Sequence, residues 1–156
     1  MEWKEGISII IPVHNQARFL QNTVEQVELQ MKNGKMKRFG LVIAEDGSFD
    51  GSGAIAKKIA EKNPFVRVLS HKRKMGKGWA IKNALKFCKY EKIIFTDADL
   101  SGGTEVFLDM AKALETADLA IGNRYGKYRP KRAIARQILG LGYKLLVDIL
   151  FLKQSY

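Results

Sequence analysis

The stretch KIIFTDADLSGG, residues 92–103, decides the fold of this chain. Its first part, Lys92 to Thr96, is a largely apolar run that predicts a buried β-strand. Two aspartates, Asp97 and Asp99, follow it one residue apart, where their carboxylates repel each other. Either they lie in a solvated loop in which Asp99 caps a helix, or they hold a divalent cation. The second interpretation rests on the preference of Mg²⁺ and Mn²⁺ for hard oxygen ligands.

Similar apolar runs recur along the 156 residues, and polar or glycine-containing loops follow them. The run ISIIIPV at residues 7–13 is typical of a strand that is covered on both faces. The predicted strands are residues 7–13, 39–44, 65–69, 92–96 and 117–121. Helices are predicted around residues 19–31, 52–62, 80–88 and 106–114, with a long helix over 132–152. This alternation predicts a single α/β domain, with a mostly parallel, Rossmann-like sheet and helices on both faces.

Ligands bind to parallel sheets at the carboxyl ends of the strands. The unusual residues of this sequence all follow predicted strands. These segments are Pro12–Asn15, Glu45–Ser48, the basic loop 71–78, Asp97–Asp99 and Gly122–Tyr125. Because such ends meet at one edge of a sheet, the sequence predicts a single site there.

The second of these segments has two interpretations. Asp46 precedes Gly47, which permits a tight turn, and Ser48 or Asp50 is a candidate cap for the helix that follows. Asn15 is a candidate cap for the first helix in the same way. The functional alternative is that Asp46 accepts a hydrogen bond from the edge of a nucleotide base.

The net charge of +11 favours an anionic partner. Basic residues gather in two segments: Lys72, Arg73, Lys74 and Lys77, and then Arg124, Lys127, Arg129, Lys131, Arg132 and Arg136. Most of them are expected to form a solvated surface. Basic side chains beside a cation held by two aspartates are, however, suited to a diphosphate. A nucleic-acid-binding module is less favoured, because it leaves Asp97 and Asp99 unexplained.

The predicted helix over residues 132–152 is apolar around most of its circumference, apart from Gln137, Lys144 and Asp148. It is either a core or oligomer helix, or an amphipathic helix that lies on a membrane surface.

The single cysteine, Cys88, excludes an internal disulfide, and the N-terminus is unlike a signal peptide. A cytoplasmic location is therefore expected.

Together these motifs resemble those of the family 2 glycosyltransferases with the GT-A (nucleotide-diphospho-sugar transferase) fold. They look most like the polyprenyl-phosphate sugar synthases, which make dolichyl-phosphate mannose or glucose. The matching motifs are Ile11–Asn15, Glu45–Ser52, Gly76–Ala80, Thr96–Ser101 and Gly122–Tyr125. Members of this family continue further, so the chain is expected to end before the segment that completes the acceptor side.

The resemblance implies a role for each matching residue. Those implied to bind the nucleotide are Pro12, Val13, His14, Asp46, Arg73, Lys77 and Ala98. Asp97 and Asp99 would hold Mg²⁺ or Mn²⁺ against the donor diphosphate. The acceptor phosphate would be bound by Arg124, Arg132 and Arg136. The implied catalytic residues are Asp97, Asp99 and Arg124.

The implied function is metal-dependent, inverting transfer of a sugar from a donor of the UDP-glucose or GDP-mannose type to a polyprenyl (dolichyl) phosphate. It would take place at the cytoplasmic face of a membrane, with peripheral membrane contact and no specific nucleic acid. Two alternatives remain: a different acceptor (polysaccharide, glycan or lipid), or a nucleotide-sugar-binding fragment without independent activity. Nucleotidylyl transfer is less favoured, since Pro12–Asn15 replaces the Gly-rich basic loop it requires. The oligomeric state is left open.

Overall fold

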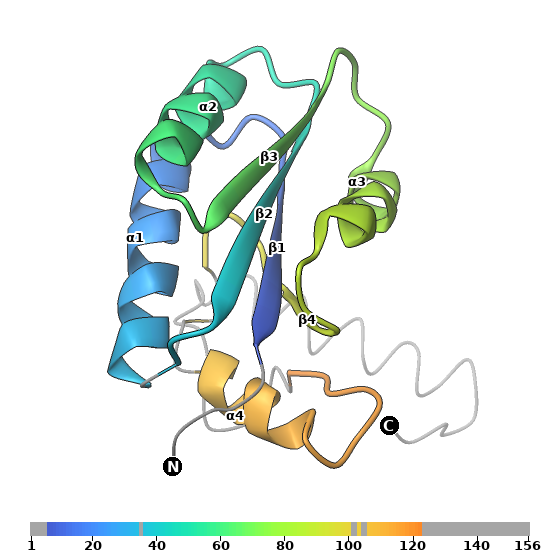
Figure 1. Cartoon of the computed structure of the whole chain (residues 1–156). Coiled ribbons are helices and arrows are strands. Elements are labelled where there is room, and N and C mark those ends of the chain that lie inside the picture. The colour runs from blue at the N-terminus through green and yellow to red at the C-terminus, as the bar shows by residue number, and fades with distance from the viewer. Residues whose placement is uncertain (1–5, 35, 101–102, 104–105, 123–156) are drawn as a thin grey trace, which may run out of the picture.

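A computed structural model of the chain describes residues 6–34, 36–100, 103 and 106–122. In these ranges four parallel strands form one sheet in the order β3-β2-β1-β4 (Figure 1). The strands are β1 (Ile7–Val13), β2 (Phe39–Asp46), β3 (Val66–His71) and β4 (Lys92–Phe95). The helices are α1 (Ala17–Asn33), α2 (Ser52–Lys62), α3 (Lys77–Ala84), the 3₁₀ helix η1 (Leu85–Phe87) and α4 (Val106–Ala113). The predicted helix over 132–152 lies outside the described residues.

The register of the sheet brings the carboxyl ends of the strands to one edge. β1 pairs with β2 as far as Val13, which lies opposite Glu45. β2 pairs with β3 so that Asp46 lies opposite His71. Because all pairs are parallel, the loops that follow the strands meet, as the sequence predicts.

The two faces of the sheet are covered by different helices (Figure 1). Alternate residues of β1, such as Ile9 and Ile11, pack with apolar residues of α1, α2 and α4 in the main core cluster. Ile10 faces the other way and packs with Ala80 and Ala84 of α3. This arrangement confirms the prediction of helices on both faces, and it follows from the alternation of side chains along a strand.

Cys88 packs at the edge of the smaller cluster and is half-buried. Burial raises the pKa of its thiol, although a hydrogen bond from Ser8 acts in the opposite direction. A thiol with a raised pKa is a poor nucleophile, and Cys88 contributes its packing against this cluster.

The prediction of a fifth strand over residues 117–121 is wrong, because these residues form no strand in the structure. Leu119 and Ile121 are 73% and 81% exposed, so the apolar side chains that suggested a buried strand do not enter the core. A strand is stable only when it pairs, and within the described ranges no strand pairs with the outer edge of β4.

Within the described ranges, no helix is both long enough and apolar enough to cross a membrane.

Candidate active site

A pocket of about 290 Å³ opens at the carboxyl edge of the sheet. The predicted site residues that line it are Pro12, Val13, His14, Asp46, Lys77, Asp97, Ala98 and Asp99. They come from the ends of β1, β2 and β4 and from the start of α3. Four loops separated in sequence therefore converge on one cavity.

The two aspartates lie on a tight turn after β4. The backbone N–H of Leu100 donates to the carbonyl oxygen of Asp97 at 3.1 Å, and Leu100 has a φ of 49°. A positive φ is uncommon for a residue other than glycine and is retained where the surroundings impose it. Ala98 is buried between the aspartates, and its carbonyl accepts a hydrogen bond from Thr23 Oγ1 of α1 at 2.5 Å. Helix α1 thus holds the turn that presents the two carboxylates.

The aspartates meet a basic side chain in the pocket. Lys77 Nζ lies 2.5 Å from Asp97 Oδ1, and the two side chains are 55% and 56% exposed. A cation therefore already lies where a metal is expected, and the carboxylate oxygens suit Mg²⁺ or Mn²⁺. Within the described residues no three His, Cys, Asp or Glu side chains gather as metal ligands. Donor phosphates and water would have to complete the coordination, as they commonly do for Mg²⁺.

Replacing Lys77 with methionine should raise the affinity for Mn²⁺ in the absence of nucleotide. The ammonium group competes with the metal for Asp97, and its removal frees that carboxylate. Because an exposed ion pair contributes little, the gain should be at most about fivefold. Titration of Mn²⁺ followed by electron paramagnetic resonance measures it. Lys82→Met, an exposed change on the same helix, should leave the affinity unchanged, and an equal gain there would refute competition at Asp97.

Asp46 joins β2 to the basic loop that precedes α3. Its side chain is 3% exposed, and its two carboxylate oxygens accept the backbone N–H groups of Met75 and Gly76 at 2.8 and 2.7 Å. Gly47 makes this contact possible: a Cβ atom there would lie 2.4 Å from the carbonyl carbon of Arg73. Asp46 thus positions the loop that carries Lys74 into the pocket.

His14 is fixed by a hydrogen bond to the end of β2. Its Nδ1 lies 2.8 Å from the carbonyl oxygen of Asp46. A carbonyl oxygen can only accept, so Nδ1 carries a proton and donates to it. The Asn15 side-chain amide lies 3.4 Å from Nε2 and can donate to it. These contacts orient the imidazole at the pocket wall.

The loops after β1 and β2 are joined by side-chain hydrogen bonds. Asn15 N and Gln16 N donate to the hydroxyl oxygens of Ser48 and Ser52, at 3.0 and 2.9 Å. Asp50 Oδ2 accepts the N–H of Ala17, the first residue of α1, at 2.9 Å. The prediction that Asn15 caps α1 is wrong: Asn15 has a φ of 54°, and its side chain accepts the N–H of Phe49 instead. Asp50, in the loop after β2, therefore caps α1.

Asp50→Asn should flatten the loss of stability in acid. Partial burial acts to raise the pKa of the Asp50 carboxyl, but hydrogen bonds from Ser52 and Ala17 outweigh it and hold this pKa below 3.8. A carboxyl with a lowered pKa in the folded state stabilises above its unfolded pKa, and this contribution is lost as the pH falls through the folded value. Thermal unfolding between pH 6 and pH 2 should show a shallower decline below about pH 4 for the variant than for wild type. Equal slopes would contradict the assignment.

Some predicted residues do not line the pocket. Arg73 is absent from the lining, and its backbone lies beside Gly47. The predicted acceptor residues Arg124, Arg132 and Arg136 lie outside the described ranges. Gln16, Lys74 and Ala80 line the pocket but were not predicted to do so.

Thr23 was also missed, although the sequence carries a signal for it. It is a buried polar residue on the otherwise apolar face of α1, which includes Leu20 and Val27. A polar side chain in such a position requires a partner, and that partner is the turn between the two aspartates.

Comparison with known proteins identifies the family of the chain. Residues 8–154 match the family model "Glycosyl transferase family 2", and the chain belongs to that family. It is 25% identical over 155 residues to a dolichyl-phosphate beta-glucosyltransferase of Trichomonas vaginalis, covering 91% of this chain and 46% of the relative. It is 36% identical over 101 residues to an undecaprenyl-phosphate 4-deoxy-4-formamido-L-arabinose transferase of Pseudomonas savastanoi pv. phaseolicola, covering 64% of this chain and 29% of the relative.

A solved structure supports the fold. The mannosyltransferase PcManGT of Pyrobaculum calidifontis, in complex with GDP-Man and Mn²⁺, superposes with a TM-score of 0.62 at 23% identity. The match covers 77% of this chain and 34% of the other. It confirms the predicted GT-A type of α/β fold. The chain spans less than half the length of these relatives.

Proposed function

We propose that this chain provides the donor site of a metal-dependent, inverting glycosyltransferase that moves a sugar from a nucleotide sugar to a polyprenyl phosphate. The observation that carries the proposal is the single pocket in which Asp97 and Asp99 lie with Lys74, Lys77, His14 and Asp46. Two carboxylates beside two ammonium groups suit a divalent cation and a diphosphate together. The two relatives compared above are named for transfer involving dolichyl phosphate and undecaprenyl phosphate, which supports an isoprenoid phosphate as acceptor.

The nucleotide would lie between the ends of β1 and β2. Pro12, Val13 and His14 would form one wall for the base and ribose. Asp46 has both carboxylate oxygens engaged with backbone N–H groups, but a carboxylate has further lone pairs that can accept a donor from a base edge. Ala98 would pack against the nucleotide, and Arg73 and Lys77 would lie on its phosphate side.

Asp97 and Asp99 would hold Mg²⁺ or Mn²⁺, which when bound supplies positive charge to offset the charge developing on the leaving diphosphate. A metal ion on Asp97 would compete with Lys77 for that carboxylate. The ammonium group of Lys77 would then be free to bind a donor phosphate oxygen. The acceptor phosphate would be held by Arg124, Arg132 and Arg136.

A phosphate acceptor is anionic near neutral pH, so it can attack the sugar carbon directly and invert it without a strong general base. This agrees with the chemistry of the pocket lining. Its one imidazole among the described residues, His14, has its Nδ1 proton bonded to a backbone carbonyl. Positioning of the two reactants would then account for much of the rate.

We also propose that the protein works at the cytoplasmic face of a membrane, with peripheral contact through the segment 132–152. One alternative is that these residues bind the donor without independent transfer. Another acceptor, such as a polysaccharide, glycan or other lipid, is the second alternative.

Two assays test this proposal. Thermal unfolding with UDP-glucose, GDP-mannose and related donors should show stabilisation by one base and sugar, and only with Mn²⁺ or Mg²⁺ present. Transfer of labelled sugar to a short polyprenyl phosphate should follow, with the matching polyprenol as control. Stabilisation without transfer would favour the donor-binding alternative. The absence of stabilisation by every donor would contradict the proposed function.

A further inference from the structure

A second pocket, of about 320 Å³, lies at the opposite end of the sheet. It lies beside Ser8 and Gly40, near the amino ends of β1 and β2, and it shares no lining residue with the candidate active site. From Ser8 to Val13 at the active-site end is five residues of strand, or about 16 Å. A ligand here would not touch the donor site.

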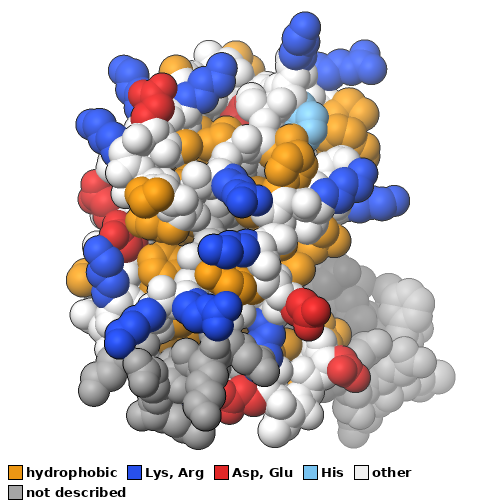
Figure 2. All heavy atoms as spheres, in the orientation of Figure 1, with side chains coloured by type: hydrophobic (Ala, Val, Ile, Leu, Met, Phe, Trp, Pro, Cys, Tyr) orange, Lys and Arg blue, Asp and Glu red, His pale blue; other side chains and the backbone are white. Residues whose placement is uncertain are grey.

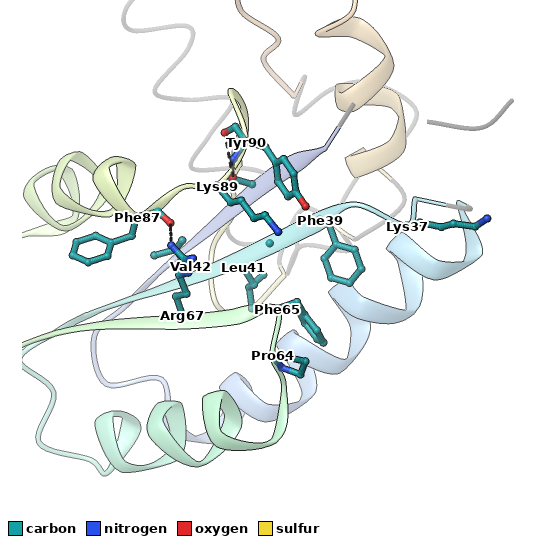
Figure 3. A pocket seen from close by; sticks show the side chains of 12 residues that line it. Lys37, Phe39, Leu41, Val42, Pro64, Phe65, Arg67, Phe87, Lys89 and Tyr90 are labelled. Atoms are coloured by element: carbon teal, nitrogen blue, oxygen red, sulfur yellow. Dashed lines mark hydrogen bonds between the residues drawn. The ribbon is translucent and has the colours of Figure 1, made fainter. Parts of the chain in front are cut away.

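Of the three basic residues that line this pocket, Lys89 and Arg67 lie over the sheet, whereas Lys37 points away (Figure 3). Lys89 lies over β2, with its ammonium group 5.4 Å from the centre of the Tyr90 ring. Arg67 extends from β3, and its Nη1 donates to the carbonyl oxygen of Phe87 at 3.4 Å. Within the described ranges the other N–H groups of Arg67 have no hydrogen-bond partner. Among the same residues, no Asp or Glu lines the pocket. The pocket is therefore suited to an anion.

The floor of the pocket lies on strand β2. It is formed by Gly40 and Val42 of β2, with the ring of Tyr90 and the backbone of Phe65 at its sides. A Cβ atom at Gly40 would lie 3.9 Å from the Tyr90 ring and 4.0 Å from the Phe65 carbonyl oxygen. A methyl group would fit there, but a larger side chain would occupy the space. The absence of a side chain at Gly40 thus leaves room for a planar group.

The surface around the pocket is also positively charged. In Figure 2 basic side chains run down the middle of the face that lies over the sheet, with apolar ones between them, and most acidic side chains visible in this view lie toward its margins. A positive field of this kind attracts anions and raises their local concentration. The volume falls at the lower end of the range for small-molecule sites.

We propose that this pocket is a second binding site, for a small compound that joins a planar ring to a phosphate group. The ring would lie on the floor at Gly40, and the phosphate would lie between Arg67 and Lys89. An arginine and a lysine offer both a forked and a point-like donor to phosphate. Aryl phosphates and nucleoside monophosphates share this chemistry, and the pocket is independent of the proposed donor site.

Phenyl phosphate is the probe that tests this site. Amide resonances of the whole ¹⁵N-labelled chain are recorded during titration in EDTA, so that metal-dependent binding at the donor site is absent. We expect saturable shifts at Gly40, Arg67 and Tyr90, with half-saturation at about 1–5 mM for so small a ligand. The amides of Val13 and Asp97 should not move.

Three variants sharpen the result. Gly40→Leu fills the floor and should abolish the shifts, whereas Lys89→Gln and Arg67→Gln should each weaken binding about tenfold by removing a charge-assisted hydrogen bond. Lys57→Gln, an exposed change on α2, is the matched control and should bind like wild type. The exposed Lys89→Gln change keeps the test valid if Gly40→Leu fails to fold.

Each other outcome would overturn the proposal. Equal shifts with inorganic phosphate would mean that the pocket binds the phosphate group by its charge and does not recognise the ring. Shifts centred on Val13 would place the ligand in the donor site. Equal weakening in Lys57→Gln, or equal shifts with vesicles containing phosphatidylserine, would mean general attraction to a basic surface.

Discussion

Asp97→Asn combined with Asp99→Asn should abolish the dependence of nucleotide-sugar binding on Mn²⁺. Asparagine keeps the shape of each side chain but removes the negative charge that draws a divalent cation to the turn after β4. Changes outside the first coordination shell of metal sites typically weaken metal binding 10- to 100-fold. Removing two proposed ligands should therefore lower the affinity for Mn²⁺ by more than about a hundredfold. Calorimetric titration of the donor, with Mn²⁺ and then with EDTA, measures it.

The matched control is Asp118→Asn, which removes one charge from an exposed loop away from the pocket. It should bind the donor like wild type. If the double variant still bound the donor in a Mn²⁺-dependent way with undiminished affinity, the metal would lie elsewhere and the assignment of the two aspartates would be wrong.

Asp46→Asn should have the largest effect on stability, because Asp46 is buried and accepts two backbone N–H groups. The oxygen of asparagine can replace only one of these acceptors, and its amide N–H groups would face the other donor. Leaving a buried donor unpaired and losing a charge-assisted bond should lower the free energy of unfolding by about 2–4 kcal/mol. Urea denaturation measures this change.

The same variant should also weaken donor binding, because the loop from Arg73 to Gly76 is held by Asp46 and carries Lys74 into the pocket. Asp118→Asn again serves as control and should change the free energy of unfolding by less than about 0.5 kcal/mol. A loss of equal size in both variants would mean that the two hydrogen bonds of Asp46 contribute nothing specific.

Much of the site could be predicted because parallel strands impose its location. Once apolar runs alternate with helical segments, the residues after each strand must meet at one edge, and His14, Asp46 and Asp97 do meet there. The two aspartates were recognisable because like charges one residue apart require compensation, and Lys77 provides it.

Contacts between loops could not be predicted in this way. Asp50 accepts the N–H group of Ala17 at the start of α1 as well as that of Ser52 at the start of α2. Asp46 binds the backbone N–H groups of Met75 and Gly76, about thirty positions away in the chain. Such pairings depend on how closely two turns approach, which local sequence patterns do not encode. The fifth strand was wrongly predicted for a related reason: an apolar run becomes a strand only where a neighbouring edge is available to pair with it.

The central claim is that Asp97 and Asp99 hold a divalent cation against the diphosphate of the donor. The most direct measurement is X-ray diffraction from crystals grown with Mn²⁺ and the nucleoside diphosphate that stabilises the protein most, with data collected at the manganese absorption edge. We expect one anomalous peak about 2.1–2.2 Å from carboxylate oxygens of this turn, bridged to the diphosphate, with Lys77 displaced from Asp97. A nucleotide bound in the pocket with no manganese between it and the two aspartates would contradict the account.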